Sequence, residues 1–257
     1  MIHFGKFKII NNEITACDYD YILNEINEVT KKNKSLLISP IASHTLVRAY
    51  YDKKLKKMLS NFDYLLPDSQ WVKRSIWFLY NIRLKERIYG PDLMLKTCSL
   101  SEKKSYKVFL YGNTKKVLKR LKIELLKKFP GLEIGGEIES KFRELTENEW
   151  KEITDKLDKS QSNIIFISLG SPKQEIFSYK LSKLLKKPLV IIPVGAAFDF
   201  ISKNKAQAPR VMQKIGLEWG FRLLSEPTRL LVRYFFYGVL FVFLIFSQKI
   251  GNFSYKE

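Results

Sequence analysis

Short apolar runs alternate with longer, lysine-rich amphipathic segments along most of this chain, and no other sequence feature constrains its fold as strongly. Continuous apolar runs are typical of strands buried on both faces, and amphipathic segments are typical of the helices that cover such strands. The alternation therefore predicts an α/β fold, with a parallel sheet covered by helices. The clearest expected strands are residues 35–39, 107–111, 163–169 and 189–194.

Residues that favour turns follow each expected strand: Pro40, Gly112 with Asn113, Gly170 and Gly195. In an open parallel sheet, the carboxyl ends of the strands form the edge that binds ligands. Backbone N–H groups at glycine turns and helix N-termini can bind a diphosphate there, although glycine also ends strands for purely conformational reasons. We therefore expect a Rossmann-like sheet with these turns at its binding edge.

A surface helix is predicted over residues 114–129, ended by Pro130 and Gly131. Apolar residues recur there at helical spacing between lysines, so one side of the helix would pack on the sheet and the other would face water. A second helix is expected over residues 71–80. The apolar positions of the first helix are Val117, Leu118, Leu121, Leu125 and Leu126.

The chain changes character after Asn204, so we expect an α/β domain over residues 1–204 and a helical C-terminal appendage over residues 205–257. Residues 230–246 are apolar or aromatic with one charge, Arg233. A helix of this length spans about 26 Å, slightly less than a hydrocarbon core of about 30 Å. It could cross a membrane marginally or lie in its interface, and the alternative is burial in the core or in the interface of a homo-oligomer.

The 45 lysine and arginine residues exceed the 26 acidic residues, and the net charge of +19 favours polyanions such as nucleic acid, an anionic membrane surface or nucleoside diphosphates. No nucleic-acid-binding motif is recognisable, so specific binding is not expected, but a basic nucleic-acid-binding protein stays an alternative function. Cys17 and Cys98 are far apart, and the N-terminus has no secretory signal pattern. We therefore expect buried thiols and a cytoplasmic location.

Asp68 follows Leu65-Leu66-Pro67 and precedes the helix expected over residues 71–80. Two roles fit this position. As the N-cap of the helix, the carboxylate would accept a hydrogen bond from a backbone N–H. As a general base on a loop at the binding edge, it would take a proton from an attacking hydroxyl.

The segment Asp18-Tyr19-Asp20 matches the short DxD pattern that holds a metal ion against a sugar nucleotide in many enzymes. Both acids directly precede an amphipathic segment, residues 21–32. We interpret them as a helix cap and a first-turn charge that favours the helix dipole. No metal site is therefore predicted here.

The segment before the apolar run is rich in charged residues that can pair or bind anions. Glu218 and Arg222 are four residues apart and could pair along a helix. Pro227 is expected to begin a new helix that carries Arg229 and Arg233 on one face. Their guanidinium groups could bind a diphosphate bidentately or, as the alternative, contact lipid head groups.

A series of motifs follows in order along residues 35–233. They are Leu65-Leu66-Pro67-Asp68, Arg87-Ile88-Tyr89-Gly90-Pro91-Asp92-Leu93, Phe109-Leu110-Tyr111-Gly112, Phe129-Pro130-Gly131-Leu132-Glu133-Ile134, Leu169-Gly170-Ser171-Pro172-Lys173-Gln174-Glu175, Val194-Gly195-Ala196-Ala197-Phe198-Asp199-Phe200, Ala208-Pro209-Arg210 and residues 217–229. Together they resemble the WecG/TagA/CpsF family of bacterial glycosyltransferases, glycosyltransferase family 26.

This resemblance implies that Asp68 is the catalytic base, that Arg87 stabilises charge near the donor and acceptor, and that Gln174 contacts the sugar. It also implies that Ser39 lies near the donor and Asp199 beside the nucleotide. The other substrate-binding residues that we expect are Gly112, Asn113, Gly170, Gly195, Phe198, Arg222, Arg229 and Arg233.

The resemblance further implies an inverting transfer from a UDP-sugar to an undecaprenyl-diphosphate-linked acceptor at the inner face of the cell membrane, in cell-surface polysaccharide biosynthesis. Neither a metal nor a cofactor is expected. The sugar could be N-acetylmannosamine, its uronic acid, another hexosamine or a hexose, because the chain departs from the family pattern at Ser69, at Pro40-Ile41 and over residues 139–142. An inactive membrane scaffold of the same fold is the other alternative.

Overall fold

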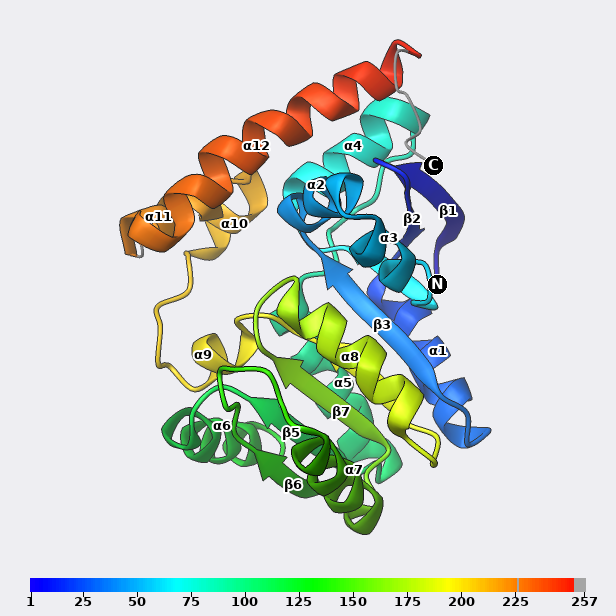
Figure 1. The fold of residues 1–257 in the computed structure, drawn as a ribbon, viewed down its shortest axis with the longest axis vertical. Helices are drawn as coiled ribbons and strands as arrows, with labels where there is room; N and C mark the ends of the chain where they lie inside the picture. The colour runs from blue at the N-terminus through cyan, green and yellow to red at the C-terminus, as the bar shows by residue number, and fades with distance from the viewer. Residues whose placement is uncertain (226, 252–257) are drawn as a thin grey trace.

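The structure is a computed structural model that describes residues 1–225 and 227–251, apart from the side chains of residues 225, 227, 229 and 232–234. Helices surround a six-stranded sheet (Figure 1). The strands are β1 His3–Ile9, β2 Asn12–Cys17, β3 Leu36–Ile41, β4 Tyr64–Pro67, β5 Val108–Gly112, β6 Ile134–Ile138, β7 Ile164–Ser168 and β8 Val190–Pro193. The helices are α1 Tyr19–Lys31, α2 Ser43–Tyr51, α3 Lys53–Leu59, α4 Gln70–Tyr80, α5 Gly90–Lys104, α6 Lys115–Lys128, α7 Glu147–Ser160, α8 Lys173–Leu184, α9 Ala197–Ile201, α10 Arg210–Ile215, α11 Glu218–Ser225 and α12 Pro227–Lys249.

The main sheet is parallel, with the strand order β4-β3-β8-β7-β5-β6. The four strands predicted from apolar runs are β3, β5, β7 and β8, and they occupy the middle of this order. In the register of β7 with β8, Ile164 pairs with Val190 and Ile167 with Pro193. The predicted α/β architecture, a Rossmann-like parallel sheet covered by helices, is therefore confirmed.

The strands that the apolar runs did not predict lie at the margins of the fold. β4 and β6 are the two edges of the main sheet, and β1 and β2 form a separate antiparallel hairpin. An edge strand has a neighbouring strand on one side only, and helices can bury it less completely than a central strand. Its sequence therefore need not be a continuous apolar run. β6 illustrates this, because Gly135 and Gly136 occupy a strand whose residues are all partly buried.

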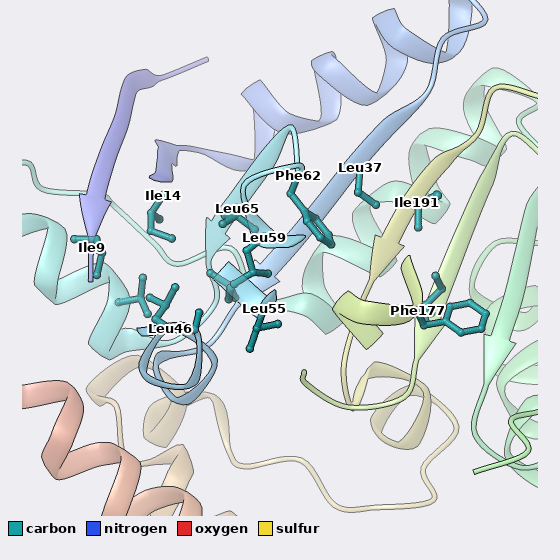
Figure 2. Packing of buried hydrophobic residues seen from close by; sticks show 14 of the residues in the cluster. Ile9, Ile14, Leu37, Leu46, Leu55, Leu59, Phe62, Leu65, Phe177 and Ile191 are labelled. Carbon is teal, nitrogen blue, oxygen red and sulfur yellow. The ribbon is translucent and has the colours of Figure 1, made fainter. Parts of the chain in front are cut away.

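Two apolar cores cover the two faces of the sheet because successive strand residues point to opposite sides. In β7, Ile164 and Phe166 pack in the core beneath α1, α5 and α6, and Ile165 and Ile167 pack in the core beneath α7 and α8. Figure 2 shows the second core where it extends beyond the sheet, from Phe177 of α8 to Ile9 of the hairpin.

The predicted helix over residues 114–129 is α6, which Thr114 caps by accepting a hydrogen bond from the Val117 N–H. Four of its predicted apolar positions are buried, but Leu126 is 40% exposed, so its assignment to the packed side was wrong. Leu125 and Leu126 are adjacent and therefore about 100° apart around the helix, and only Leu125 faces the sheet.

The C-terminal segment forms α10, α11 and α12, and the apolar run lies within α12, which begins at Pro227 as predicted. α12 packs against α2 and α4, beside the hairpin (Figure 1). Within the ranges that the structure covers, no helix combines the length and the apolar character that a membrane crossing needs. The division of the chain at residue 204 stays a prediction.

Candidate functional site

Two cavities lie at the carboxyl ends of the parallel strands and share part of their walls. The first, which we call the polar cavity, has a volume of about 360 Å³. The second, the apolar cavity, has a volume of about 550 Å³ and lies between α12 and the start of α4. Residues that line both are Ala42, Asp68, Tyr89 and Arg222. The polar cavity is also lined by Asn113, Gly170, Ser171, Gln174, Gly195, Asp199 and Phe200, and the apolar cavity by Trp71, Arg87, Glu218, Phe235, Gly238, Val239 and Phe243.

Asp68 lies where the two cavities meet. It directly follows β4, and its Oδ1 accepts a hydrogen bond of 3.0 Å from the N–H of Gly90 at the start of α5. The helix that follows, α4, is capped by Ser69, whose hydroxyl accepts from the Val72 N–H. The cap role that we considered for Asp68 is therefore wrong, and the neighbouring residue takes it because its side chain reaches the first turn.

The surroundings of Asp68 raise the pKa of its carboxyl above the ordinary value. Burial is the main cause, and the Arg87 guanidinium and the Gly90 N–H oppose it. Glu218 raises the pKa further, and Arg222 lowers it. Both arginines favour the ionised form, but the loss of water on burial outweighs them, so the net shift of the pKa is upward. A raised pKa suits a general base, since it brings the proton affinity of the carboxylate nearer to neutral pH.

Arg87 and Tyr89 are bound by one carboxylate from the C-terminal segment. Glu218 of α11 accepts hydrogen bonds from Arg87 Nη2 at 2.5 Å and from the Tyr89 hydroxyl at 2.9 Å. The predicted pairing with Arg222 is the longer contact, 3.9 Å between Nη1 and Oε1. Arg87 and Glu218 are each 10% exposed, so this is a buried ion pair that joins α11 to the edge of the sheet domain.

Besides Asp68, six of the predicted site residues line the polar cavity. Asn113, Gly170, Gln174, Gly195 and Asp199 line the polar cavity, and Arg222 lines both cavities.

Other predicted residues do not line the polar cavity. Arg87 lines only the apolar cavity. Ser39 and Phe198 are fully buried and line neither, so Phe198 is a core residue. Gly112 also lines neither; its φ of +118° and the Ser168 carbonyl oxygen, 2.3 Å from where a Cβ would lie, require a glycine.

Arg229 and Arg233 belong to α12, but their side chains lie outside the described residues, so their predicted binding of anions stays a prediction. The carboxylates of the DxD match have structural roles, as we interpreted them. Asp18 caps α1 by accepting from the Tyr21 N–H, and Asp20 lies in the first turn. Among the side chains that the structure describes, no group of three or more His, Cys, Asp or Glu residues is arranged to hold a metal ion.

Tyr89 and Glu218 are site residues that the sequence did not single out for the site. Tyr89 lay inside a recognised motif, but tyrosine is found both buried and exposed, so its residue type alone does not indicate a site. Glu218 had been paired with Arg222 by helical spacing, and its stronger partner, Arg87, is 131 residues away in sequence. Only a signal from residue pairs distant in sequence could have revealed that contact.

A parallel sheet with a polar cavity at its strand ends is the arrangement of α/β enzymes that bind their substrates at this edge. Over residues 7–254 the chain matches the family model described as "Glycosyl transferase WecG/TagA/CpsF family", and it belongs to that family. It is therefore a glycosyltransferase, as the motifs predicted.

Two curated relatives have the same name, N-acetylglucosaminyldiphosphoundecaprenol N-acetyl-beta-D-mannosaminyltransferase. The relative from Bacillus spizizenii is 30% identical over 225 residues, which are 88% of this chain and 83% of the relative. The relative from Bacillus subtilis (strain 168) is 30% identical over 193 residues, 75% of this chain and 73% of the relative.

Proposed function

We propose that this glycosyltransferase moves a hexosamine, of the N-acetylmannosamine type, from a UDP-sugar to a sugar on an undecaprenyl-diphosphate carrier. The observation that carries the proposal is the place of Asp68, between a polar cavity and an apolar cavity that share its side chain as a wall. A donor with a charged nucleotide and an acceptor with an apolar chain need two such compartments. The names of both relatives support this acceptor class and this sugar.

In this proposal the UDP-sugar occupies the polar cavity. Asn113, Gly170 and Gly195 are there at the ends of β5, β7 and β8, with Asp199 beside them. Backbone N–H groups at the Asn113 and Gly170 turns could bind phosphate oxygens without a metal, whereas the Gly195 N–H already donates to Gln174. The first units of the polyprenyl chain would occupy the apolar cavity, whose wall on α12 carries Phe235, Val239 and Phe243.

The chemical step is a single displacement. Ionised Asp68 accepts the proton of the acceptor hydroxyl as its oxygen forms a bond to the anomeric carbon. The bond from this carbon to the diphosphate oxygen breaks at the same time, and UDP leaves with the electron pair, so the anomeric configuration inverts. In this proposal Arg222 stabilises the negative charge that grows on UDP, which its position in the wall of both cavities supports.

The exposed side of α12 supports a location at the inner face of the cell membrane. Phe236, Val239 and Phe243 are 59%, 67% and 65% exposed. Contact of such an apolar group with water is unfavourable, and exposed apolar groups of this kind mark interaction sites. An exposed apolar helix face on a protein whose net charge is +19 is typical of a helix that lies in the interface of an anionic membrane.

The experiment that tests the proposal offers purified protein a panel of UDP-sugars with a short-chain lipid-diphosphate N-acetylglucosamine acceptor, with and without EDTA. We expect transfer from UDP-N-acetylmannosamine that EDTA does not abolish. We also expect Asp68→Asn to bind UDP normally and to lose at least about 100-fold in kcat, since general-base catalysis contributes about 10²–10⁴-fold.

Full turnover by Asp68→Asn would contradict the base assignment. Transfer that stops with EDTA and returns with a divalent cation would contradict metal independence. A wild-type protein that turns over no UDP-sugar in the panel would favour the inactive scaffold.

A further inference from the structure

Glu175 is a fully buried carboxylate behind the wall of the polar cavity, in the first turn of α8. It lies next to Gln174, which lines the cavity, but Glu175 itself does not line it. A carboxylate without access to water is unfavourable unless hydrogen-bond donors surround it. The hydrogen-bond donors around Glu175 therefore indicate its role.

The donors to Glu175 come from separate segments of the chain. Its Oε1 accepts from Gln174 Nε2 at 3.1 Å and from the Ser39 hydroxyl at 3.3 Å. Its Oε2 accepts from the Ser171 hydroxyl at 2.8 Å, and that hydroxyl is also 2.7 Å from the Thr45 hydroxyl of α2. One buried group thus connects β3, the turn after β7, and α8.

These bonds determine which way the amide of Gln174 faces. The backbone N–H of Gly195 can only donate, and it donates to Gln174 Oε1 at 3.0 Å. The amide nitrogen must then face the other side, where it needs an acceptor, and Oε1 of Glu175 is that acceptor. The orientation of Gln174, and the positions of the Ser171 and Gly195 turns that line the cavity, therefore depend on the carboxyl of Glu175.

Burial raises the pKa of Glu175, and the hydrogen bonds from Ser171, from Gln174 and from Ser39 oppose the rise. This balance is consistent with a group whose partners compensate for the loss of water.

We propose that Glu175 is the positioning residue of the donor cavity, which holds Gln174 and the Ser171 turn in the geometry that binds the UDP-sugar. The proposal rests on the function proposed above and adds the group that sets donor affinity. It also gives Ser39 a role without contact to the substrate, because Ser39 is fully buried, does not line the cavity and donates its hydroxyl hydrogen bond to Glu175.

The test is the Glu175→Gln variant, which keeps the size of the side chain and replaces one acceptor oxygen with a donor. At least one of the three bonds is then lost or reversed, so we expect the KM for the donor and the Kd for UDP to rise about tenfold or more. The value of kcat should stay within about threefold, because Asp68 and the acceptor cavity are unchanged. Steady-state kinetics and calorimetric titration with UDP measure these quantities.

Two further variants separate positioning from folding. Ser39→Ala removes one buried donor to Glu175 and should raise the donor KM in the same direction by a smaller factor, even if Glu175→Gln does not fold. Ser178→Ala is the matched control: its hydroxyl donates to the Gln174 carbonyl oxygen at 2.7 Å, in the same helix, without contact to Glu175. The control should leave the donor KM unchanged.

An unchanged donor KM in Ser39→Ala and in folded Glu175→Gln would overturn the proposal. So would an equal rise of the donor KM in Ser178→Ala, which would indicate a general effect of disturbing α8. Wild-type protein that binds no UDP-sugar would instead overturn the proposed donor, and the role of Glu175 with it. The two failures are therefore distinguishable.

Discussion

Asp68 receives its chemical environment from residues that are distant in sequence. The Gly90 N–H and the Arg87 guanidinium come from the segment that enters α5, and Glu218 and Arg222 come from α11. The loss of water raises the pKa of the carboxyl, and these charges adjust it in opposite directions. The proton affinity of the proposed base therefore depends on whether α11 is in place.

This dependence predicts a pH effect. Transfer needs ionised Asp68, so kcat should fall as the pH falls through the pKa of Asp68, which lies above that of an ordinary carboxyl. The Glu218 carboxylate raises that pKa, so Glu218→Gln removes a negative charge and should move the acidic limb of the kcat profile to lower pH. Rates measured across the pH range would locate the limb.

Glu149→Gln provides the matched control, because Glu149 of α7 pairs with Lys141 and Arg143 and does not line either cavity. The acidic limb of the kcat profile of Glu149→Gln should lie at the same pH as that of the wild type. An acidic limb in Glu218→Gln at the wild-type pH would argue against this account of Asp68.

At the scale of elements, α12 acquires two sides through packing and not through its composition. Leu230, Phe241, Leu244 and Ile245 are buried, whereas the exposed apolar side chains are Leu231, Phe235, Phe236, Val239, Phe243 and Phe246. The end of the helix is held to the hairpin by Gln248, which accepts from the Ile10 N–H at 3.0 Å and donates to the Lys8 carbonyl oxygen at 2.7 Å. The exposed side is thus held in a defined orientation.

We predict that this exposed side binds membranes. Leu231 and Phe236 are 52% and 59% exposed and line neither cavity, so the double substitution Leu231→Glu with Phe236→Glu should leave the site unchanged. Each side chain that enters the interface contributes about 1.5–3 kcal/mol, so the affinity for anionic vesicles should fall at least about 100-fold. Sedimentation with vesicles measures it.

Ile123→Glu is the control, since Ile123 is 57% exposed on α6, a helix of the sheet domain. It should bind vesicles like the wild type. Equal binding by the double variant would show that this side of α12 does not contact lipid.

At the scale of the whole molecule, the C-terminal segment and the sheet domain share a core. Phe241, Leu244 and Ile245 belong to the same apolar cluster as Leu46 of α2 and Ile76 of α4. The buried pair of Arg87 and Glu218 adds a polar connection. Loss of one partner from such a pair commonly costs about 3–5 kcal/mol.

Removal of residues 205–257 should therefore lower the free energy of unfolding, besides releasing the protein from membranes. Three large buried side chains of α12 contribute about 1.5–3 kcal/mol each, so we expect a loss of about 4 kcal/mol or more. Urea denaturation of the shortened and full chains measures the difference. Phe241→Ala should lower the free energy of unfolding by about 3 kcal/mol, a part of the loss expected for the shortened chain. Equal unfolding free energies would instead indicate that residues 1–204 fold as an independent unit.

Much of the fold was predictable from the sequence, because local pattern carries the information for central elements. A strand buried on both faces must be apolar throughout, which identified β3, β5, β7 and β8. A helix that covers a sheet must be amphipathic, which identified α6. β1 and β6 were missed because most of their residues are only partly buried or exposed, which imposes a weaker apolar pattern. β4 is largely buried, but it has only four residues and so offers a short pattern.

The sequence by itself determined the parallel α/β architecture, the turns at the strand ends and, through ordered motifs, the family. Only the tertiary structure decided that Ser69 and not Asp68 caps α4, that Ser39 and Phe198 lie behind the cavity wall, and that Glu218 binds Arg87. The physical reason is that burial, pKa and ion pairing depend on groups brought together from distant parts of the chain. Strand and helix patterns depend on neighbours along the chain and can be recognised without that knowledge.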